Sequence, residues 1–539
     1  MSAAILGRMM LAFEGLTLPP RIERRLADAP AAGMSLFRAV NVRTAGQLRE
    51  LTEAFQRGSA IGAGGAGGEA PSRPALIAAD QEAGQFLALG DDTTPFAGNM
   101  ALGAADDLDL TEAVGRAIGL EALAMGVNVV YAPSLDLATN PANPAIGIRA
   151  FGDEPGHAAR HGIAFLRGLQ GAGVAGAVKH FPGIGDLAAD THHELAQVEA
   201  PRSVLDGREF APFRAAFAAG DDGAPRLVMS GHVGLPAVSG RADLPATLSR
   251  AVMTDLLRDE LGFAGLTISD ALDMGAITGA AYGAGIEAGV PDVVAALDAG
   301  IDLLLASPDV AALERIEAVL VRAADAGAID PIAAAASERR LAALRSWLGS
   351  RGPLPDLDVV GSREHAALAA RLAARSITLV RDPGKLLPVA TDAARRVLAV
   401  MPRPADLTPA DTSSLVAPGL AAALRRDHGL VDEVVVEQRP DAAAIAAVRD
   451  RASAADLVVI GTIDGHRQTE QLALVDAVAA NGTPTIAVAL RGPWDVARYP
   501  AGVTALATYS ILPPSLAALA DVLAGRASAT GQLPVTMAT

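Results

Sequence analysis

The sequence predicts an α/β protein in two parts, an N-terminal (β/α)8 TIM-type barrel followed by a smaller three-layer α/β sandwich. Three observations predict it. Short apolar runs of strand length alternate with Ala-, Leu- and Arg-rich segments of helical length before residue 348. The run LGSRGPLPDL at 348–357 disfavours both helix and strand. A shorter series of the same alternation follows it.

The first part contains seven clear strand candidates and a weak eighth near Ile5. The seven clear candidates are 34–37, 75–79, 127–132, 176–179, 227–230, 266–269 and 301–306. Amphipathic stretches such as 45–56 and 250–261 lie between them. Eight parallel βα units fit a barrel, whose chemistry lies at the carboxyl ends of the strands. A doubly wound sheet is the competing topology.

The second part contains five strand candidates separated by helical segments. They are 397–401, 431–436, 457–461, 485–490 and 503–508. We therefore expect a catalytic barrel over 1–347, a linker over 348–357 and an α/β sandwich domain over 358–539.

Composition narrows the possible partners. The 539 residues carry 44 Lys and Arg against 61 Asp and Glu, a net charge of −17, which disfavours nucleic acid. Cysteine is absent, so thiolate nucleophiles and Cys-ligated zinc are excluded. The opening MSAAILGRMMLAFEGL is not typical of an export signal, and no uncharged apolar run is long enough for a membrane span. We expect a soluble cytoplasmic protein; its oligomeric state is left open.

Histidines are concentrated in one region. Six of the nine fall within about 75 residues of each other: His157, His161, His180, His192, His193 and His232. Four of them, from His180 onward, lie at or beyond the ends of two predicted strands, where a barrel has its active site. A single histidine is more often packed or solvated than catalytic, so the surrounding motif must decide.

The segment AVKHFPGIGDLAADTHHE runs from a strand that ends at Lys179 and His180 into a long loop. In this loop Asp190 precedes His192 by two residues, close enough for the carboxylate to hold one ring nitrogen and leave the other free. Such a dyad transfers protons near neutral pH. The simpler alternative is an Asp that accepts backbone N–H bonds in a turn.

Carboxylates also end two other predicted strands. Asp270 follows the apolar strand in LTISDALDM, and Asp80 ends LIAAD in the same way. A carboxylate in such a place needs nearby cations, and Arg149, Lys179 and His180 are available if the barrel closes.

Two reactions fit these groups. A nucleophilic carboxylate with a separate proton donor is the arrangement of a retaining glycosidase. A metal-dependent hydrolase is the rival, with His180, His192, His232 and Asp270 as ligands, although no His-x-His or His-Glu-x-x-His spacing occurs. From the residues alone, sugar hydrolysis is favoured slightly.

The motifs also carry a family resemblance. KHFPGIGDLAADTHHE resembles the signature loop of glycoside hydrolase family 3 β-N-acetylglucosaminidases, the kind that recycles cell-wall fragments. DQE at 80–82, APSLDLATNPANPAIGIRAFG and PATLSRAVMTDLLRDELGFAGLTISDALDM are similar to other motifs of the family. After the linker, AARSITLVRD, LLPV, RGPWDVARYP and GQLPV resemble the sandwich of its two-domain members. The resemblance spans nearly the whole chain.

The resemblance implies a β-N-acetylhexosaminidase that removes terminal β-linked N-acetylglucosamine from small oligosaccharides or muropeptides. Asp270 is implied as the nucleophile and His192, oriented by Asp190, as the acid and base. The residues implied to bind the sugar are Asp80, Arg149, Lys179 and His180. No cofactor and no metal are expected.

This sequence departs from the family pattern at four positions, which puts the substrate rather than the reaction in doubt. Gln85 stands where many relatives have Arg, Ile184 where a second loop His is common, Thr191 in place of Ser, and Ala196 where Pro often ends the loop. A β-N-acetylglucosaminide phosphorylase and a β-glucosidase are the alternatives on the same site. A sugar-binding regulatory protein is the non-enzyme alternative. An aromatic content of 3% argues for a pocket that holds one sugar.

Overall fold

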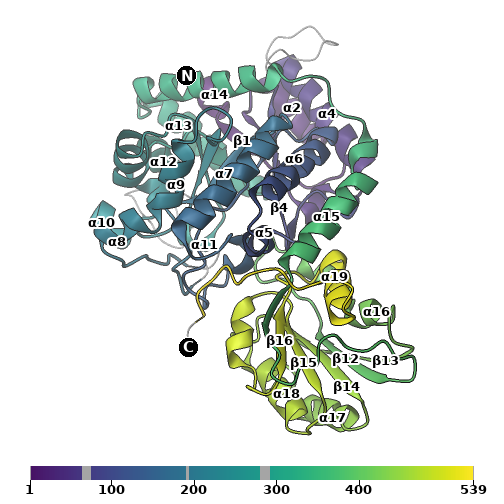
Figure 1. Cartoon of the computed structure of the whole chain (residues 1–539). Helices are drawn as coiled ribbons and strands as arrows, with labels where there is room; N and C mark the ends of the chain where they lie inside the picture. Colours follow the sequence, from purple (N-terminus) through teal and green to yellow (C-terminus); the bar gives the residue numbers. More distant parts are fainter. Residues whose placement is uncertain (1, 63–73, 190–193, 279–291, 538–539) are drawn as a thin grey trace.

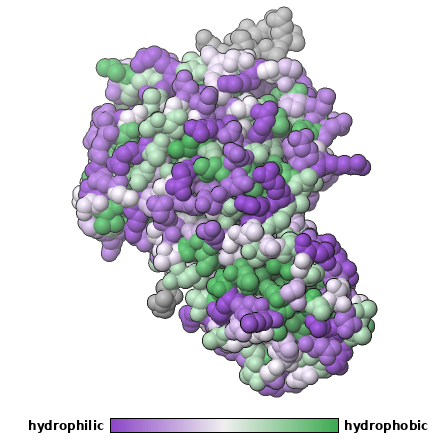
Figure 2. All heavy atoms as spheres, viewed as in Figure 1, coloured by the Kyte–Doolittle hydropathy of each residue, from purple (hydrophilic) through white to green (hydrophobic). Residues whose placement is uncertain are grey.

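The chain folds into a helix-covered barrel and a smaller C-terminal α/β domain (Figure 1). The computed structural model describes residues 2–62, 74–189, 194–278 and 292–537. Within these residues, no helix is both long and apolar enough to cross a membrane. Figure 2 shows mainly polar side chains on the viewed face of the barrel, whereas apolar ones gather on the C-terminal domain.

Eight parallel strands form the barrel in the order β10-β1-β2-β3-β6-β7-β8-β9. Their bounds are β1 Met9–Leu11, β2 Gly33–Leu36, β3 Leu76–Ala79, β6 Val129–Val130, β7 Ala175–Phe181, β8 Leu227–Ser230, β9 Leu266–Ser269 and β10 Leu304–Leu305. A parallel bridge between Ile268 and Leu303 joins the two ends of this order, so the sheet closes on itself. The predicted barrel is confirmed, and the doubly wound alternative is wrong.

The helices around the barrel mostly follow its strands. They are α1 Ser2–Leu6, α2 Pro20–Asp28, α3 Arg38–Asn41, α4 Ala45–Gly62, α5 Asn99–Ala105, α6 Leu108–Ala124, α7 Pro155–Gly171, α8 Arg202–Gly207, α9 Phe210–Phe217, α10 Pro236–Ser239, α11 Gly275–Thr278, α12 Val293–Ala299, α13 Val310–Asp325 and α14 Pro331–Gly349, with the turns η1 Gly147–Arg149 and η2 Ala246–Leu248 and the helix η3 Ala251–Glu260. N-terminal capping determines where several of these helices begin. Their N-cap carboxylates accept backbone N–H bonds from the first helical turn; they are Asp107, Glu154, Asp309 and Asp330.

The first strand was predicted in the wrong place. Ile5 lies in helix α1, and the strand begins four residues later, at Met9. The Ala-rich run before Ile5 favours a helix. The strand follows Arg8, whose buried side chain bonds to the carbonyls of Ile301 and Asp302 next to β10. A small ribbon of β4 Gln81–Ala83 and β5 Phe86–Leu87 beyond β3 was not predicted.

The C-terminal sheet has six strands in the order β11-β16-β15-β14-β12-β13. Five are parallel and close to prediction: β12 Arg396–Pro402, β13 Leu430–Val436, β14 Leu457–Thr462, β15 Thr485–Ala489 and β16 Thr504–Ala507. The unpredicted β11 Thr378–Arg381 pairs antiparallel with β16 at the edge. The helices of this part are α15 Arg363–Ser376, α16 Leu420–Leu424, α17 Ala442–Ala452, α18 Thr469–Ala479 and α19 Pro513–Leu523, with the turns η4 Leu357–Val359, η5 Ser413–Leu415 and η6 Pro493–Arg498.

The junction between the two parts is more extensive than a simple linker. Helix α14 runs to Gly349, inside the segment predicted as linker. Helix α15 then packs against both α5 and α6 of the barrel and α19 of the C-terminal domain. The His365 ring of α15 contacts the buried Glu121 carboxylate of α6 at 2.8 Å. The domain boundary at 348–357 stays a prediction, and α15 belongs to the contact between the two parts.

Candidate active site

The polar residues predicted for the site lie at the carboxyl ends of the barrel strands. Asp80 directly follows β3, and Lys179 and His180 lie at the carboxyl end of β7, just before its last residue, Phe181. Arg149 ends η1, in the loop after β6, and Asp270 follows β9. A closed barrel brings the carboxyl ends of its strands around one opening. The fold therefore brings residues that are up to 190 positions apart in the chain to one end.

Three of these side chains, those of Asp80, Arg149 and Lys179, form a buried ionic cluster with Glu82 at its centre. The Glu82 carboxylate accepts two parallel bonds from Arg149, at 2.9 Å from Nε and 2.7 Å from Nη2. Lys179 Nζ lies 2.6 Å from Glu82 Oε1 and also contacts the carboxylate of Asp80. The Arg149 guanidinium lies over the Phe86 ring, 4.2 Å from its centroid. Only Asp80 in this ionic cluster keeps substantial exposure, 26% of its side chain.

Electrostatics keep Glu82 and Lys179 charged despite their burial. Burial alone would raise the pKa of Glu82, but the charges and hydrogen bonds of Arg149 and Lys179 lower it to about 2. Burial alone would likewise lower the pKa of Lys179, but Asp80 and Glu82 raise it. The exposed edge of Asp80 is thus a carboxylate whose position is fixed by a buried ammonium. Such a group is suited to accept hydrogen bonds from sugar hydroxyls.

His180 is held by a buried carboxylate that was not predicted as a site residue. Its Nδ1 donates to Asp136 Oδ2 at 2.6 Å, and Asp136 also accepts bonds from the Ser134 hydroxyl and the Ile184 amide. Burial would raise the pKa of Asp136, but His180 and these donors lower it. The other nitrogen, Nε2, accepts from Arg149 Nη2 at 3.3 Å. Asp136 therefore fixes the tautomer and the orientation of His180.

Asp270 lies at the same end of the barrel as this cluster. Its backbone amide donates to the carbonyl of Ser230 at 3.2 Å, and its Oδ1 accepts the Ala271 amide at 2.8 Å. Burial raises the pKa of Tyr131, and the charges of Asp80 and Asp270 raise it further. Both carboxylates therefore act on the same buried phenol. Asp270 thus lies near the same phenol as Asp80, one of the sugar-binding candidates.

The loop that leads to the predicted dyad is anchored to the neighbouring βα loop. The side-chain amide of Asn143 donates to the backbone carbonyls of Ile184 at 2.7 Å and Gly185 at 3.2 Å. The side-chain amide of Asn140 donates to the backbone carbonyl of Asp186 at 3.1 Å. These bonds fix the chain a few residues before position 190.

The close approach of the loop backbone to Leu137 explains why residue 185 is a glycine. A Cβ at Gly185 would lie 1.7 Å from the carbonyl oxygen of Leu137, so any other residue would push the loop away. Asp190, Thr191 and His192 lie outside the described residues. Their roles stay predictions.

The C-terminal domain also contacts the barrel loop that contains Asn140 and Asn143. His466 Nε2 donates to the carbonyl of Pro141 at 2.9 Å, and its Nδ1 lies 2.7 Å from the buried Asp495. Burial would lower the pKa of His466, but Asp495 raises it. Pro141 lies between Asn140 and Asn143, so the second domain supports the barrel loop that holds the predicted acid-base loop.

Three of the four departures from the family pattern lie among the described residues. Gln85 faces the C-terminal domain. Its backbone carbonyl oxygen accepts hydrogen bonds from the backbone amide and the side-chain hydroxyl of Thr412, at 2.8 and 2.9 Å. Ile184 is buried in the core of the barrel. The Ala196 carbonyl accepts the Gly234 amide at 2.8 Å, on the return of the loop to β8. Gln85 therefore contributes to the contact between the domains.

The metal-hydrolase alternative does not agree with the contacts of its described ligands. Both nitrogens of His180 are occupied, by Asp136 and Arg149. His232 Nδ1 lies 2.8 Å from the Thr247 hydroxyl, and its Nε2 lies 3.0 Å from the Ala271 carbonyl. Among the described residues, no metal-ligating group includes His180, His232 or Asp270. His232 instead supports the backbone next to Asp270.

Sequence reasoning missed Glu82, Asp136 and Tyr131 as parts of the site. Glu82 and Asp136 stand in the motifs DQE and PSLD, each just after a buried strand, which is the available signal. Their partners are 67 and 44 residues away, so the pairing depends on the closed barrel.

Comparison with known proteins decides the family. Residues 23–344, more than half of the chain, match the family described as Glycosyl hydrolase family 3 N terminal domain. The chain belongs to glycosyl hydrolase family 3. It is therefore a glycosidase, as the sequence motifs predicted.

Curated relatives and a solved structure of family 3 match well beyond the barrel motifs. The chain is 29% identical to Beta-hexosaminidase A of Pseudoalteromonas piscicida, over 97% of this chain and 92% of the relative. It is 33% identical to a Beta-hexosaminidase of Xanthomonas axonopodis pv. citri (strain 306), over 60% of this chain and 90% of the relative. The structure of a glycoside hydrolase family 3 beta-N-acetylglucosaminidase from Paenibacillus sp. str. FPU-7 superposes with a TM-score of 0.90 at 33% identity. That superposition covers 100% of this chain and 99% of the other, so both domains match.

Proposed function

We propose that this family 3 glycosidase removes terminal β-linked N-acetylglucosamine with retention of configuration. The observation that carries the proposal is the position of Asp270 directly after β9, at the same end of the barrel as the cluster of Asp80, Lys179, Glu82 and Arg149. The names of the two curated relatives and of the Paenibacillus enzyme support the substrate.

In the first step, an Asp270 carboxylate oxygen attacks the anomeric carbon, and the bond from that carbon to the leaving oxygen breaks. His192 gives its proton to the leaving oxygen, with Asp190 orienting the ring. The glycosyl group is then held as an ester of Asp270. A neutral base formed at His192 adds no second negative charge beside the nucleophile.

In the second step, His192 takes a proton from water, and the resulting oxygen attacks the anomeric carbon from the face that the first leaving group left. The bond to Asp270 breaks, which restores the carboxylate. Two inversions at one carbon give net retention.

Asp80, Arg149, Lys179 and His180 are proposed to bind the sugar in this site. The carboxylate oxygens of Asp80 would accept hydrogen bonds from sugar hydroxyls, whereas Lys179 and Arg149 would donate hydrogen bonds to sugar oxygens. The contacts of Glu82 and Asp136 keep these donors in fixed directions, which lowers the reorganisation needed during the reaction.

We also propose small oligosaccharides or muropeptides as substrates, in the cytoplasm, as part of cell-wall recycling. The resemblance of KHFPGIGDLAADTHHE to the loop of cell-wall-recycling members supports this role. Long polysaccharide is disfavoured because the chain has only two Trp and four Tyr for a stacking groove. Cell fractionation, with muropeptide analysis after deletion of the gene, tests this role.

The deciding experiment is turnover of p-nitrophenyl β-N-acetylglucosaminide with and without inorganic phosphate. We expect free N-acetylglucosamine, released first as the β-anomer, at a rate that phosphate does not change. A sugar 1-phosphate product would show a phosphorylase, and faster turnover of the matched glucoside would show a β-glucosidase. Absence of turnover on every glycoside would favour a sugar-binding protein.

A further inference from the structure

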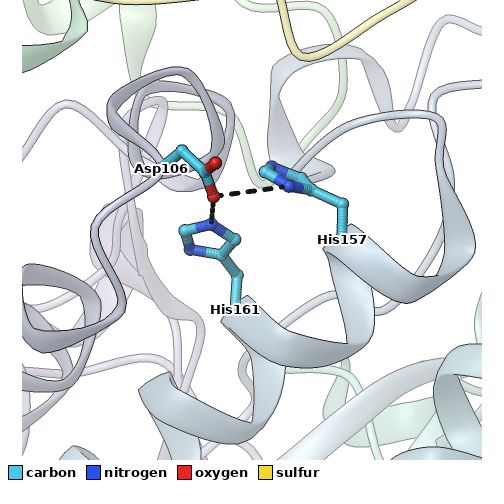
Figure 3. A group of neighbouring side chains, drawn as sticks. All are labelled: Asp106, His157 and His161. Carbon is cyan, nitrogen blue, oxygen red and sulfur yellow. Dashed lines mark hydrogen bonds and ion pairs between the residues drawn. The ribbon is translucent and has the colours of Figure 1, made fainter.

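A second group of metal-ligating side chains lies among the helices around the barrel. Asp106 follows α5, and His157 and His161 stand one turn apart in the first half of α7. Figure 3 shows that both imidazoles point toward the same carboxylate oxygen. Among the described residues, no other group of three or more His, Asp or Glu side chains brings its ligand atoms together in this way. None of the three takes part in the proposed sugar chemistry.

The distances from the Asp106 carboxylate to the two imidazoles fit one small ion between them. Asp106 Oδ1 lies 3.3 Å from His161 Nε2 and 3.6 Å from His157 Nδ1. Two ligands about 2.0–2.1 Å from a tetrahedral zinc ion lie roughly 3.3 Å apart. Two histidines at i and i+4 of a helix are a common half of such a site.

The hydrogen bonds of His161 leave a lone pair facing the carboxylate. The Thr111 hydroxyl donates its one hydrogen to the carbonyl of Asp107 at 3.0 Å. With that hydrogen so placed, its oxygen, 2.8 Å from His161 Nδ1, accepts the proton of the tautomer that carries hydrogen on Nδ1. In that tautomer His161 Nε2 presents a lone pair toward Asp106 Oδ1, and a metal ion between the two atoms would bind both. Thr111 corresponds to the outer partner that usually orients a metal-bound imidazole.

Hydrogen bonding also does not account for His157. The 3.6 Å from its Nδ1 to Asp106 Oδ1 is too long for a hydrogen bond. Its other nitrogen, Nε2, is buried and has no hydrogen-bond partner within the described part of the chain. The exposed Arg160 reaches Nδ1 at 3.5 Å, the outer limit of a hydrogen bond, and its long side chain can move aside. A metal ion on Nδ1 would give this ring a strong partner.

The surroundings suit an ion with one water ligand. His161 is fully buried and stacks on Phe151, with ring centroids 5.6 Å apart, whereas the Asp106 side chain is 52% exposed. The site is thus fixed on one side and open to solvent on the other. Phe151 follows Arg149 by two residues, so an ion here would fasten the Arg149 loop and α7 to the junction of α5 and α6.

We propose that Asp106 Oδ1, His157 Nδ1 and His161 Nε2 bind one structural zinc ion, with water as the fourth ligand. Two imidazoles and one carboxylate match the ligand preference of zinc. The proposal does not depend on the glycosidase reaction, because none of its residues touches the sugar site. Its rival is a hydrogen-bonded Asp106–His161–Thr111 network that holds no metal.

The test uses the full-length protein, stripped with EDTA and passed through a desalting column. Zinc is then added, and its binding is followed by calorimetry, by elemental analysis after gel filtration and by the thermal unfolding midpoint. We expect one zinc per chain and a higher midpoint. Cobalt in place of zinc should give the visible absorption of a tetrahedral ion.

Asp106→Asn is the main variant, because the residue is exposed and Asn also accepts its left-handed backbone. It should weaken zinc binding at least ~10-fold, as should His157→Ala, and Thr111→Val should weaken it roughly 10- to 100-fold. Asp109→Asn, which removes a nearby exposed carboxylate, is the matched control and should bind as the wild type does. Zinc that fails to bind the wild type, or binds Asp106→Asn equally well, would overturn the proposal.

Discussion

Arg149 and Glu82 form a two-point ion pair in the wall of the site, at 2.7 and 2.9 Å, with both side chains at most 6% exposed. Lys179 shares the same carboxylate. Loss of the Glu82 charge would leave two buried cations with Asp80 as their remaining nearby acid in this cluster. The pair therefore stabilises the fold and also fixes the direction of two sugar-binding candidates.

Glu82→Gln should lower the free energy of unfolding by about 3–5 kcal/mol at pH 7, because it leaves a buried charge uncompensated. Urea unfolding measures this loss. Glu53→Gln, which removes an exposed carboxylate from a surface ion pair, is the control and should change stability by less than about 1 kcal/mol.

Acid should weaken the same contact. The pKa of Glu82 is about 2 in the folded protein against its usual 4.5, so its contribution is complete above pH 4.5 and is lost as the pH falls toward 2. The difference in unfolding midpoint between wild type and Glu82→Gln should therefore narrow below pH 4.5. A difference that stays constant down to pH 3 would argue against a charged Glu82.

Asp270→Ala should lower turnover by several orders of magnitude while the protein stays folded, because the covalent route is lost. The Asp270 backbone bond to Ser230 does not depend on the side chain. Circular dichroism and the unfolding midpoint check the fold, and Asp273→Ala, an exposed neighbour, is the matched control. Rates like those of the wild type would exclude Asp270 as the nucleophile.

His192→Ala should damage cleavage of poor leaving groups severely and spare the glycosylation step of activated aryl glycosides. A stable phenolate needs little protonation, whereas a sugar alkoxide needs the proton, and general acid catalysis is typically worth about 10²- to 10⁴-fold. Asp190→Ala should show the same pattern more mildly, and the double variant should be little worse than His192→Ala. Equal losses on both kinds of substrate would indicate a binding role for His192.

Chelation should leave the chemical step intact. The proposed reaction uses a carboxylate and an imidazole, and the proposed zinc site lies outside it. EDTA-treated enzyme should therefore keep its rate at 25 °C, although its unfolding midpoint should fall. A rate that is lost on chelation and restored by zinc or manganese would revive the metal-hydrolase alternative.

A chain that ends near Leu354 should be poorly soluble. It would expose the faces of α5 and α6 that α15 covers, and it would lose the bond from His466 to Pro141. Size-exclusion chromatography and turnover measure the outcome. A soluble and fully active barrel would show that the second domain is dispensable for both.

The sequence by itself determined the barrel, the second sheet and the candidate positions for the chemistry. Apolar strands such as those before Asp80 and Asp270 are local patterns, because a buried parallel strand needs a continuous apolar run whatever its neighbours are. The same holds for the loop motif that pointed to the family. The weak first strand failed because three residues, Met9–Leu11, are too short a signal against the Ala-rich helix before them.

Only the tertiary structure decided which charges meet. Arg149 pairs with Glu82, His180 with Asp136, and His466 with the Pro141 loop, across 67, 44 and 325 positions. No local pattern encodes these pairs, because they arise from the closure of the barrel and the contact between the domains. The packing of α7 against α5 and α6 likewise turned His157 and His161, two members of the histidine-rich region, toward Asp106 after α5. The sequence shows which side chains are chemically competent, but tertiary packing sets the partner that fixes the pKa and the orientation of each of them.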